Sequence, residues 1–175
     1  MIKIEQPAMS LNARELYPIA MSNTRIVYDD VTPFWLVNNI VSIAASTPEG
    51  KPLTLVVNAH SWVTEKHVFL GIKLGTGIYS EDVGKHFGKL KPMINKIILQ
   101  CCAAARDEPG RQFCKKLART TGAFVYAADI DQSYTLQDIT GLWEYPNHID
   151  DFEGNVFEFN NSGAMRPFQF ERVKR

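Results

Sequence analysis

"NKIILQCC", residues 95–102, runs from two polar residues through a continuous apolar stretch to two adjacent cysteines. Such unbroken apolar runs are typical of strands buried on both faces of a parallel sheet. Two further runs have the same character: "LTLVVNAH", residues 53–60, and "AFVYAADI", residues 123–130. We therefore expect three buried strands, each ending in a residue capable of chemistry.

The segments between these runs have helical patterns. Residues 33–46 begin with Thr32 as the expected N-cap and Pro33 at the first helical position. Residues 79–93 begin near Ser80, another expected N-cap, and residues 108–122 end at Gly122, an expected C-cap. The apolar face of the first helix is expected to contain Phe34, Val37, Ile40, Val41 and Ala44, and that of the last Phe113, Cys114, Leu117 and Ala118.

Four more segments have strand-like patterns: residues 24–30, 67–75, 141–146 and 155–163. The alternation of strands and helices predicts a three-layer α/β/α sandwich with a mostly parallel sheet, closed by a C-terminal hairpin or edge strands. Neither repeats nor linker-like stretches divide the chain, so residues 1–175 are expected to form a single domain.

Composition excludes several classes of function. The chain is 45% hydrophobic and 22% charged, as is usual for a soluble globular protein, and 19 basic residues balance 19 acidic ones. This neutral balance predicts no nucleic-acid or membrane partner. The lysines of residues 85–96 are expected to form the solvated face of a helix.

Three cysteines argue against a disulfide framework and for a reducing compartment. The N-terminal residues 1–18 lack an apolar signal-peptide core, and no apolar run reaches 18 residues. We therefore expect a cytoplasmic protein, with export by a non-classical route as the alternative. Oligomeric state is left open.

The carboxyl ends of the three buried strands are expected to meet at one rim of the sheet, where α/β proteins bind ligands. His60, the pair Cys101–Cys102 and Asp129 mark these ends. A cysteine attacks as the thiolate, and a neighbouring histidine can remove its proton and later donate it to a leaving amine. Because strand residues alternate in direction, Cys101 and Cys102 must face opposite sides, and we expect Cys101 to be core filler.

The residues around these positions resemble a known family. "IILQCC", residues 97–102, is similar to the caspase-type nucleophile strand, in which Q-A-C lies about 50 residues after a histidine. "VVNAHS", residues 56–61, is similar to the strand of that family that ends in His-Gly. The fuller likeness, over about residues 54–130, is to bacterial caspase-like domains of the clan that also holds clostripain, the gingipains and separase.

This resemblance implies a cysteine endopeptidase acting on a protein or peptide through a thioester intermediate. It implies that Cys102 is the nucleophile and His60 the base, with the backbone N–H groups of Ser61 and Cys102 stabilising the oxyanion. It further implies that Asp129, with Asp131 in reserve, lies by the substrate pocket. An acid there favours a basic substrate side chain by charge complementarity.

Two residues depart from the family pattern: Ser61 replaces the usual glycine, and Cys101 the usual small residue. The alternative function is therefore a catalytically inactive caspase-like binding or adaptor domain. A flavodoxin-like ligand-binding domain is a third possibility, but "GIKLGTG", residues 71–77, lacks the G-K-[ST] of a phosphate loop and is expected to form a hairpin or loop.

Less specific interpretations remain for individual residues. Cys102 and Cys114 can be inert buried thiols, His60 a buried structural histidine, and Asp129 a turn cap. Adjacent cysteines on a strand diverge and no C-x₂-C pair exists, so neither a zinc site nor a redox pair is expected, and no cofactor is implied. Surface or structural roles are expected for the remaining histidines, His67, His86 and His148.

Overall fold

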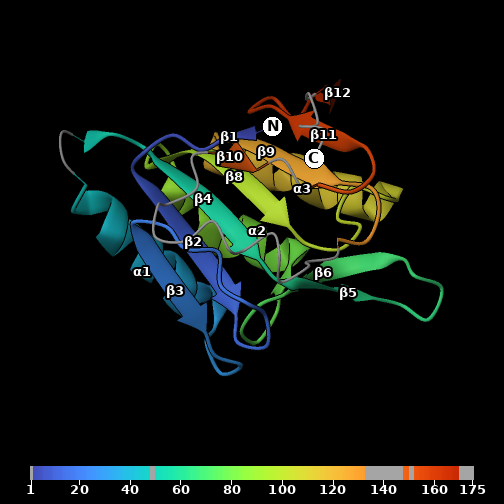
Figure 1. Ribbon diagram of the computed structural model, residues 1–175, viewed down its shortest axis with the longest axis horizontal. Coiled ribbons are helices and arrows are strands. Elements are labelled where there is room, and N and C mark those ends of the chain that lie inside the picture. Colours follow the sequence, from blue (N-terminus) through green and yellow to red (C-terminus); the bar gives the residue numbers. More distant parts are fainter. Residues whose placement is uncertain (1, 48–49, 133–147, 150–151, 170–175) are drawn as a thin grey trace.

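The computed structural model describes residues 2–47, 50–132, 148–149 and 152–169. A seven-stranded sheet in the order β12-β11-β9-β8-β4-β2-β3 forms its centre (Figure 1). Five neighbouring strands, β3, β2, β4, β8 and β9, pair in parallel, whereas β11 pairs antiparallel with β9 and β12 pairs antiparallel with β11. The α/β class, the mostly parallel sheet and the antiparallel C-terminal strands are therefore confirmed.

The strands of this sheet are β2 (Ala8–Ala13), β3 (Asn23–Val27), β4 (Leu53–Asn58), β8 (Ile94–Gln100), β9 (Phe124–Ala128), β11 (Val156–Phe159) and β12 (Met165–Phe168). The helices are α1 (Pro33–Ala45), α2 (Ser80–His86), the 3₁₀ helix η2 (Phe87–Leu90) and α3 (Glu108–Thr121). A separate antiparallel sheet contains β5 (His60–Val63), β6 (Phe69–Lys73) and β7 (Ile78–Tyr79), and β1 (Ile2–Lys3) pairs with β10 (His148–Ile149). The strand predicted over residues 141–146 lies outside the described residues.

The local signals at α1 and α3 are confirmed. The Thr32 hydroxyl accepts a hydrogen bond from the Trp35 N–H at 3.3 Å, and Gly122 ends α3 in the left-handed conformation, with φ 73°. The predicted stripe on α3 is buried throughout. On α1 the stripe was partly wrong, because Phe34 is 51% exposed and Leu36 takes its place in the core.

Two predicted elements differ from the structure. The helix expected over residues 79–93 ends as α2 at His86 and continues only as η2, and its N-cap is Tyr79 rather than Ser80. The Tyr79 N–H donates to the Asp82 carboxylate at 2.9 Å. The strand expected over residues 67–75 is β6, which pairs with β5 and β7 instead of joining the main sheet. "GIKLGTG" is part of the β6–β7 hairpin, as expected.

All helices of the described part of the chain pack on one face of the sheet, where their apolar residues share a core with alternate residues of the strands. The reason is topological. The steps from β3 to β4, β4 to β8 and β8 to β9 all run in the same direction across the sheet, so right-handed crossovers place α1, α2 and α3 on the same face. Only the step from β2 back to β3 runs the other way.

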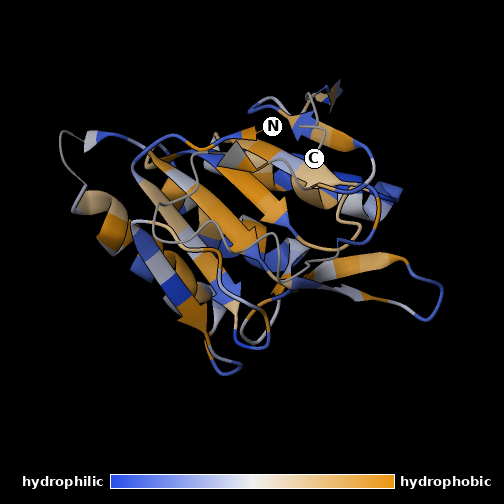
Figure 2. Cartoon of the chain, in the orientation of Figure 1, coloured by the Kyte–Doolittle hydropathy of each residue, from blue (hydrophilic) through white to orange (hydrophobic). Residues whose placement is uncertain are grey.

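The opposite face carries a second core, covered by irregular chain and short strands instead of helices. Ile19 and Met21, from the crossover between β2 and β3, pack there with Ile2, Ile149 and Phe152. In the described residues, the third layer of the expected sandwich is therefore built from these segments. The parallel strands β4 and β8 are apolar on both faces (Figure 2).

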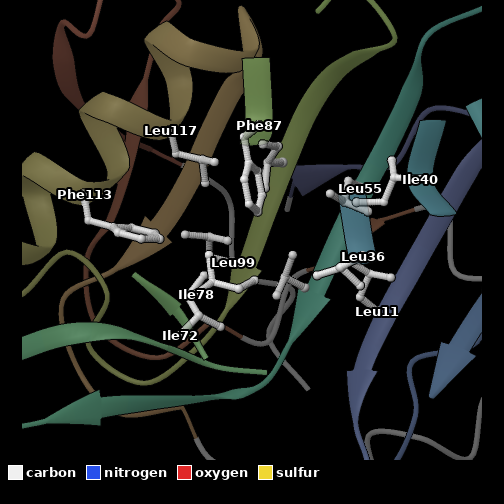
Figure 3. Close-up of a pocket in the computed structure, with 12 residues that line it drawn as sticks. Leu11, Leu36, Ile40, Leu55, Ile72, Ile78, Phe87, Leu99, Phe113 and Leu117 are labelled. Carbon is white, nitrogen blue, oxygen red and sulfur yellow. The ribbon is translucent and has the colours of Figure 1, made fainter. Parts of the chain in front are cut away.

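One small cavity, of about 10 Å³, lies in the core between the sheet and the helices (Figure 3). Only apolar side chains line it, among them Leu99, Phe87 and Phe113. It is about the size of a single water molecule but offers no polar partner, so it is a packing defect and not a ligand site.

Candidate functional site

Contrary to the prediction, the two adjacent cysteines do not belong to the buried strand, because β8 ends at Gln100; they directly follow it and have different environments. Cys101 is fully buried in the core on the helical side, whereas Cys102 is partly exposed. Burial raises the pKa of the Cys101 thiol far above its ordinary value, and burial does the same for the Cys114 thiol on α3. The prediction that Cys101 and Cys114 are core residues is confirmed, and Cys102 is the cysteine that reagents and substrates can reach.

Backbone hydrogen bonds hold the loop that follows Cys102. The Ala103 N–H donates to the Ile130 carbonyl at 2.9 Å, and the Ala105 N–H donates to the Ala128 carbonyl at 2.8 Å. Ala103 has φ 52°, a left-handed conformation that a non-glycine residue adopts at a cost and that is often found at functional sites. The loop is therefore ordered in a sharp turn directly after the candidate nucleophile.

Asp107 connects this loop to α3 and to the small sheet. One carboxylate oxygen caps α3 by accepting from the Gly110 N–H at 2.7 Å, and the other accepts from the Phe69 N–H of β6 at 2.7 Å. The backbone of α3 also approaches the loop closely: a Cβ added at Gly110 would lie 2.5 Å from the Ala104 carbonyl oxygen. The Asp107 side chain thus joins the start of α3, the loop after Cys102 and the β5–β6 hairpin.

We expect Asp107→Ala to lower the free energy of unfolding by about 2–3 kcal/mol, since it removes a helix cap and leaves the buried Phe69 N–H without a partner. Asp107→Asn, which keeps one acceptor, should cost less. Urea unfolding of the two variants measures both values. Equal stability of Asp107→Ala and the wild type would show that the Asp107 side chain contributes nothing.

The candidate base lies on the chain segment beside Cys102. The Ala59 N–H donates to the Gln100 carbonyl at 3.2 Å, which continues the β4–β8 pairing past Asn58. The Ser61 hydroxyl then donates to the Cys102 carbonyl at 2.5 Å. The structure therefore places the backbone around His60 next to the backbone around Cys102, at the carboxyl rim of the sheet.

The prediction that His60 ends the long buried strand is wrong. β4 ends at Asn58, and His60 is the first residue of β5, opposite Lys73 of β6. The chain leaves the parallel sheet here because β5 pairs with β6 to form the hairpin that projects from the body of the protein (Figure 1).

The side chains of the two candidates are not bonded to each other. The Cys102 thiol donates to the Gln132 carbonyl, with 3.8 Å between sulfur and oxygen, and the His60 ring makes no hydrogen bond to any described residue. The Cys102 N–H, one of the two predicted oxyanion donors, likewise has no acceptor among the described residues. Catalytic hydrogen bonds are often loose before substrate binds, so this geometry is compatible with a resting site.

Both predicted substrate-binding acids have partners within the protein. The Asp129 carboxylate accepts from the Asn155 backbone N–H at 2.8 Å and from the Asn155 side chain at 2.9 Å. Asp131 forms an ion pair with Arg106 at 2.9 Å. A substrate cation would have to compete with these groups for either carboxylate.

A cavity of about 490 Å³ opens next to the hairpin that carries His60. Trp62 and Lys73 line it from the hairpin, and Arg14, Glu15 and Asp29 line it from the ends of β2 and β3. Lys73 is the cross-strand partner of His60, and Trp62 lies two residues beyond His60 on the same strand. Residues in these positions share one face of a sheet, so His60 lies on the same face of the hairpin as two of the residues that line the cavity.

The other histidines differ in position. His67 occupies the turn between β5 and β6 with φ 58°, and His86 packs edge-on against Phe34. His148 lies in β10.

Sequence analysis missed the contribution of Arg106 and Gln132 to the site. Neither position carries a local signal, because Arg106 bonds to Asp131 and Gln132 bonds to Glu153, each more than 20 residues away in the chain.

The described elements form an α/β protein with a partly exposed cysteine and a histidine on adjacent segments at the carboxyl rim of a parallel sheet. Neither a protein-family model, nor a curated protein, nor a solved structure matches the chain. In the described ranges, acidic, cysteine and histidine side chains form no group of three or more that could hold a metal ion. None of the described helices has the length and apolar character needed to cross a bilayer.

Proposed function

We propose that the protein is a caspase-like cysteine endopeptidase in which Cys102 is the nucleophile and His60 the base. The observation that carries the proposal is the hydrogen bond from Ser61 to the Cys102 carbonyl, which holds the two candidates on neighbouring segments. The resemblance of residues 54–130 to caspase-like domains supports the same pair.

The proposed reaction has two steps. His60 takes the Cys102 proton, and the thiolate attacks the substrate carbonyl carbon while the Cys102 and Ser61 N–H groups bind the oxyanion. The tetrahedral intermediate collapses to a thioester as the C–N bond breaks, and His60 donates its proton to the leaving amine. Water, activated by His60, then hydrolyses the thioester and restores the thiol.

The surroundings suit this chemistry in part. The cavity of about 490 Å³ next to the hairpin that carries His60 is large enough for substrate side chains. A reducing compartment such as the cytoplasm would keep the nucleophilic thiol reduced. Asp129 and Asp131 remain the candidate substrate-binding residues, and any preference for basic residues requires that Asp129 exchange Asn155 for substrate.

A second function, a non-catalytic caspase-like binding domain, is favoured by one specific observation. The Cys102 thiol is bonded to the Gln132 carbonyl and not to His60. In such a domain Cys102 and His60 would be independent residues with no effect on each other.

Thiol labelling separates the two functions. With limiting iodoacetamide at pH 6.5, we expect Cys102 to be alkylated at least about tenfold faster than a free model thiol, which is almost fully protonated at that pH, while the buried Cys101 and Cys114 stay unlabelled. His60→Ala should slow the Cys102 reaction at least about tenfold. His67→Ala is the matched control, because His67 lies at the far end of the hairpin. An unchanged Cys102 rate in His60→Ala would rule out the proposed pair.

A further inference from the structure

The segment that follows β9 passes over Cys102. We call residues 129–132 the strap. Its last residue, Gln132, offers the carbonyl that accepts from the Cys102 thiol, and the preceding Ile130 carbonyl accepts from the Ala103 N–H. The strap therefore contacts both the candidate nucleophile and the residue after it.

Charged side chains fasten the strap to the cysteine loop. Arg106, four residues after Cys102, donates from Nη2 to the Asp131 carboxylate at 2.9 Å and from Nε to the Asp129 carbonyl at 3.3 Å. The Asp131 side chain is 70% exposed and that of Arg106 34% exposed. Water and salt ions therefore compete for these two charged groups, so the ion pair is weak and easily broken.

Polar contacts of Gln132 fasten the other side of the strap. Its side-chain amide donates to the Glu153 carbonyl at 3.1 Å and to the Ile130 carbonyl at 2.9 Å, and its amide oxygen accepts from the Glu153 N–H at 3.0 Å. These bonds hold the Gln132 backbone at the position where its carbonyl meets the Cys102 sulfur.

The contact with Gln132 opposes nucleophilic attack. A thiol can donate to a carbonyl oxygen, but a thiolate cannot, and the two negative ends repel each other. As long as the strap is in place, the Cys102 proton is directed to Gln132 and away from a base. A reactive Cys102 requires that the Gln132 carbonyl move.

From these contacts we propose that the strap is a latch that keeps Cys102 in a resting state, with the Arg106–Asp131 ion pair as its releasable fastening. Release exposes the thiol to reagents and to His60. The significance of release for catalysis rests on the proposed peptidase function, but the accessibility of the thiol does not.

The latch is tested by the rate at which iodoacetamide alkylates Cys102 in the full-length protein. Asp131→Ala should raise this rate about two- to fivefold, because an exposed ion pair stabilises only modestly. Gln132→Ala, which removes the contacts to Glu153, should raise it more, about fivefold or above. Added 0.5 M KCl should accelerate the wild type and leave Asp131→Ala nearly unchanged.

Two controls separate release of the latch from general loosening. Glu108→Gln removes another exposed ion pair, to Lys115 at 3.8 Å, and should leave the Cys102 rate unchanged. Peptide mapping should show Cys101 and Cys114 unlabelled in every variant. Rates in both strap variants within a factor of two of the wild type would overturn the latch. If the strap variants label faster while His60→Ala has no effect, the latch stands and the peptidase function fails.

Discussion

Replacing Cys102 with alanine should lower the rate of peptide hydrolysis at least about a thousandfold, because the proposed reaction passes through a thioester that alanine cannot form. His60→Ala should cause a loss of similar size, since without a base the thiol stays protonated and the leaving amine is not protonated. The double variant should be hardly worse than either single variant, because the two residues act as a unit. Release of fluorophore from a peptide mixture randomised at each position measures all three.

The matched control is Cys114→Ala, which removes a thiol that is fully buried on α3, where it donates to the Ala104 carbonyl, and which should retain activity in proportion to the folded fraction. Circular dichroism at the assay temperature establishes that fraction. Hydrolysis by purified Cys102→Ala at the wild-type rate would assign the activity to another residue or to a contaminant. A wild type without hydrolysis, combined with His60-independent labelling, would favour the binding domain.

Alkaline pH should destabilise the protein steeply, because Cys101 and Cys114 are fully buried and burial raises the pKa of both thiols. In the unfolded chain these thiols have the ordinary pKa of about 8.5 and lose their protons above it, whereas in the folded protein they stay protonated. The folded state then binds more protons, so the free energy of unfolding falls as pH rises. Well above pH 8.5 each thiol contributes about 1.4 kcal/mol per pH unit, and the two together about 2.8 kcal/mol per pH unit.

Urea unfolding between pH 8 and pH 10, with reductant present, measures this slope. Cys114→Ala should lower the overall stability by leaving a small cavity, yet its pH slope should be about half that of the wild type. Above pH 10 the buried Tyr126, whose pKa is raised by desolvation and then by its hydrogen bond to Glu158, adds to the slope, and Tyr126→Phe should remove that addition. If the free energy of unfolding fell equally steeply with pH in the wild type and in Cys114→Ala, the buried Cys114 thiol would not contribute to the pH dependence.

The local parts of the fold were accessible from the sequence. The apolar runs located β4, β8 and β9, and the Thr32 and Gly122 caps marked ends of α1 and α3. These signals depend on near neighbours in the chain: apolar periodicity, a capping oxygen, and a glycine that tolerates positive φ.

The elements that were missed are those whose identity depends on distant partners. β2 lies between β4 and the edge strand β3, and its sequence "AMSLNA" has polar residues, Ser10 and Asn12, on a fully buried face. They are buried because they bond to one another and to the crossover, for example from the Ile19 N–H to Asn12 at 2.8 Å. No pattern in the sequence around β2 predicts such a hydrogen-bond network.

The sequence by itself determined the parallel strands β4 and β8, with His60 and Cys102 each two residues beyond the end of its strand, and it predicted correctly that Cys101 is buried in the core. Continuous apolar runs and the alternation of strands and helices carry this information. Only the tertiary structure decided that the helices share one face, that β5 leaves the sheet at His60, and that Gln132 meets the Cys102 thiol. These arrangements depend on contacts between residues far apart in the chain, and the energy of such a contact appears only once the fold has brought its two ends together.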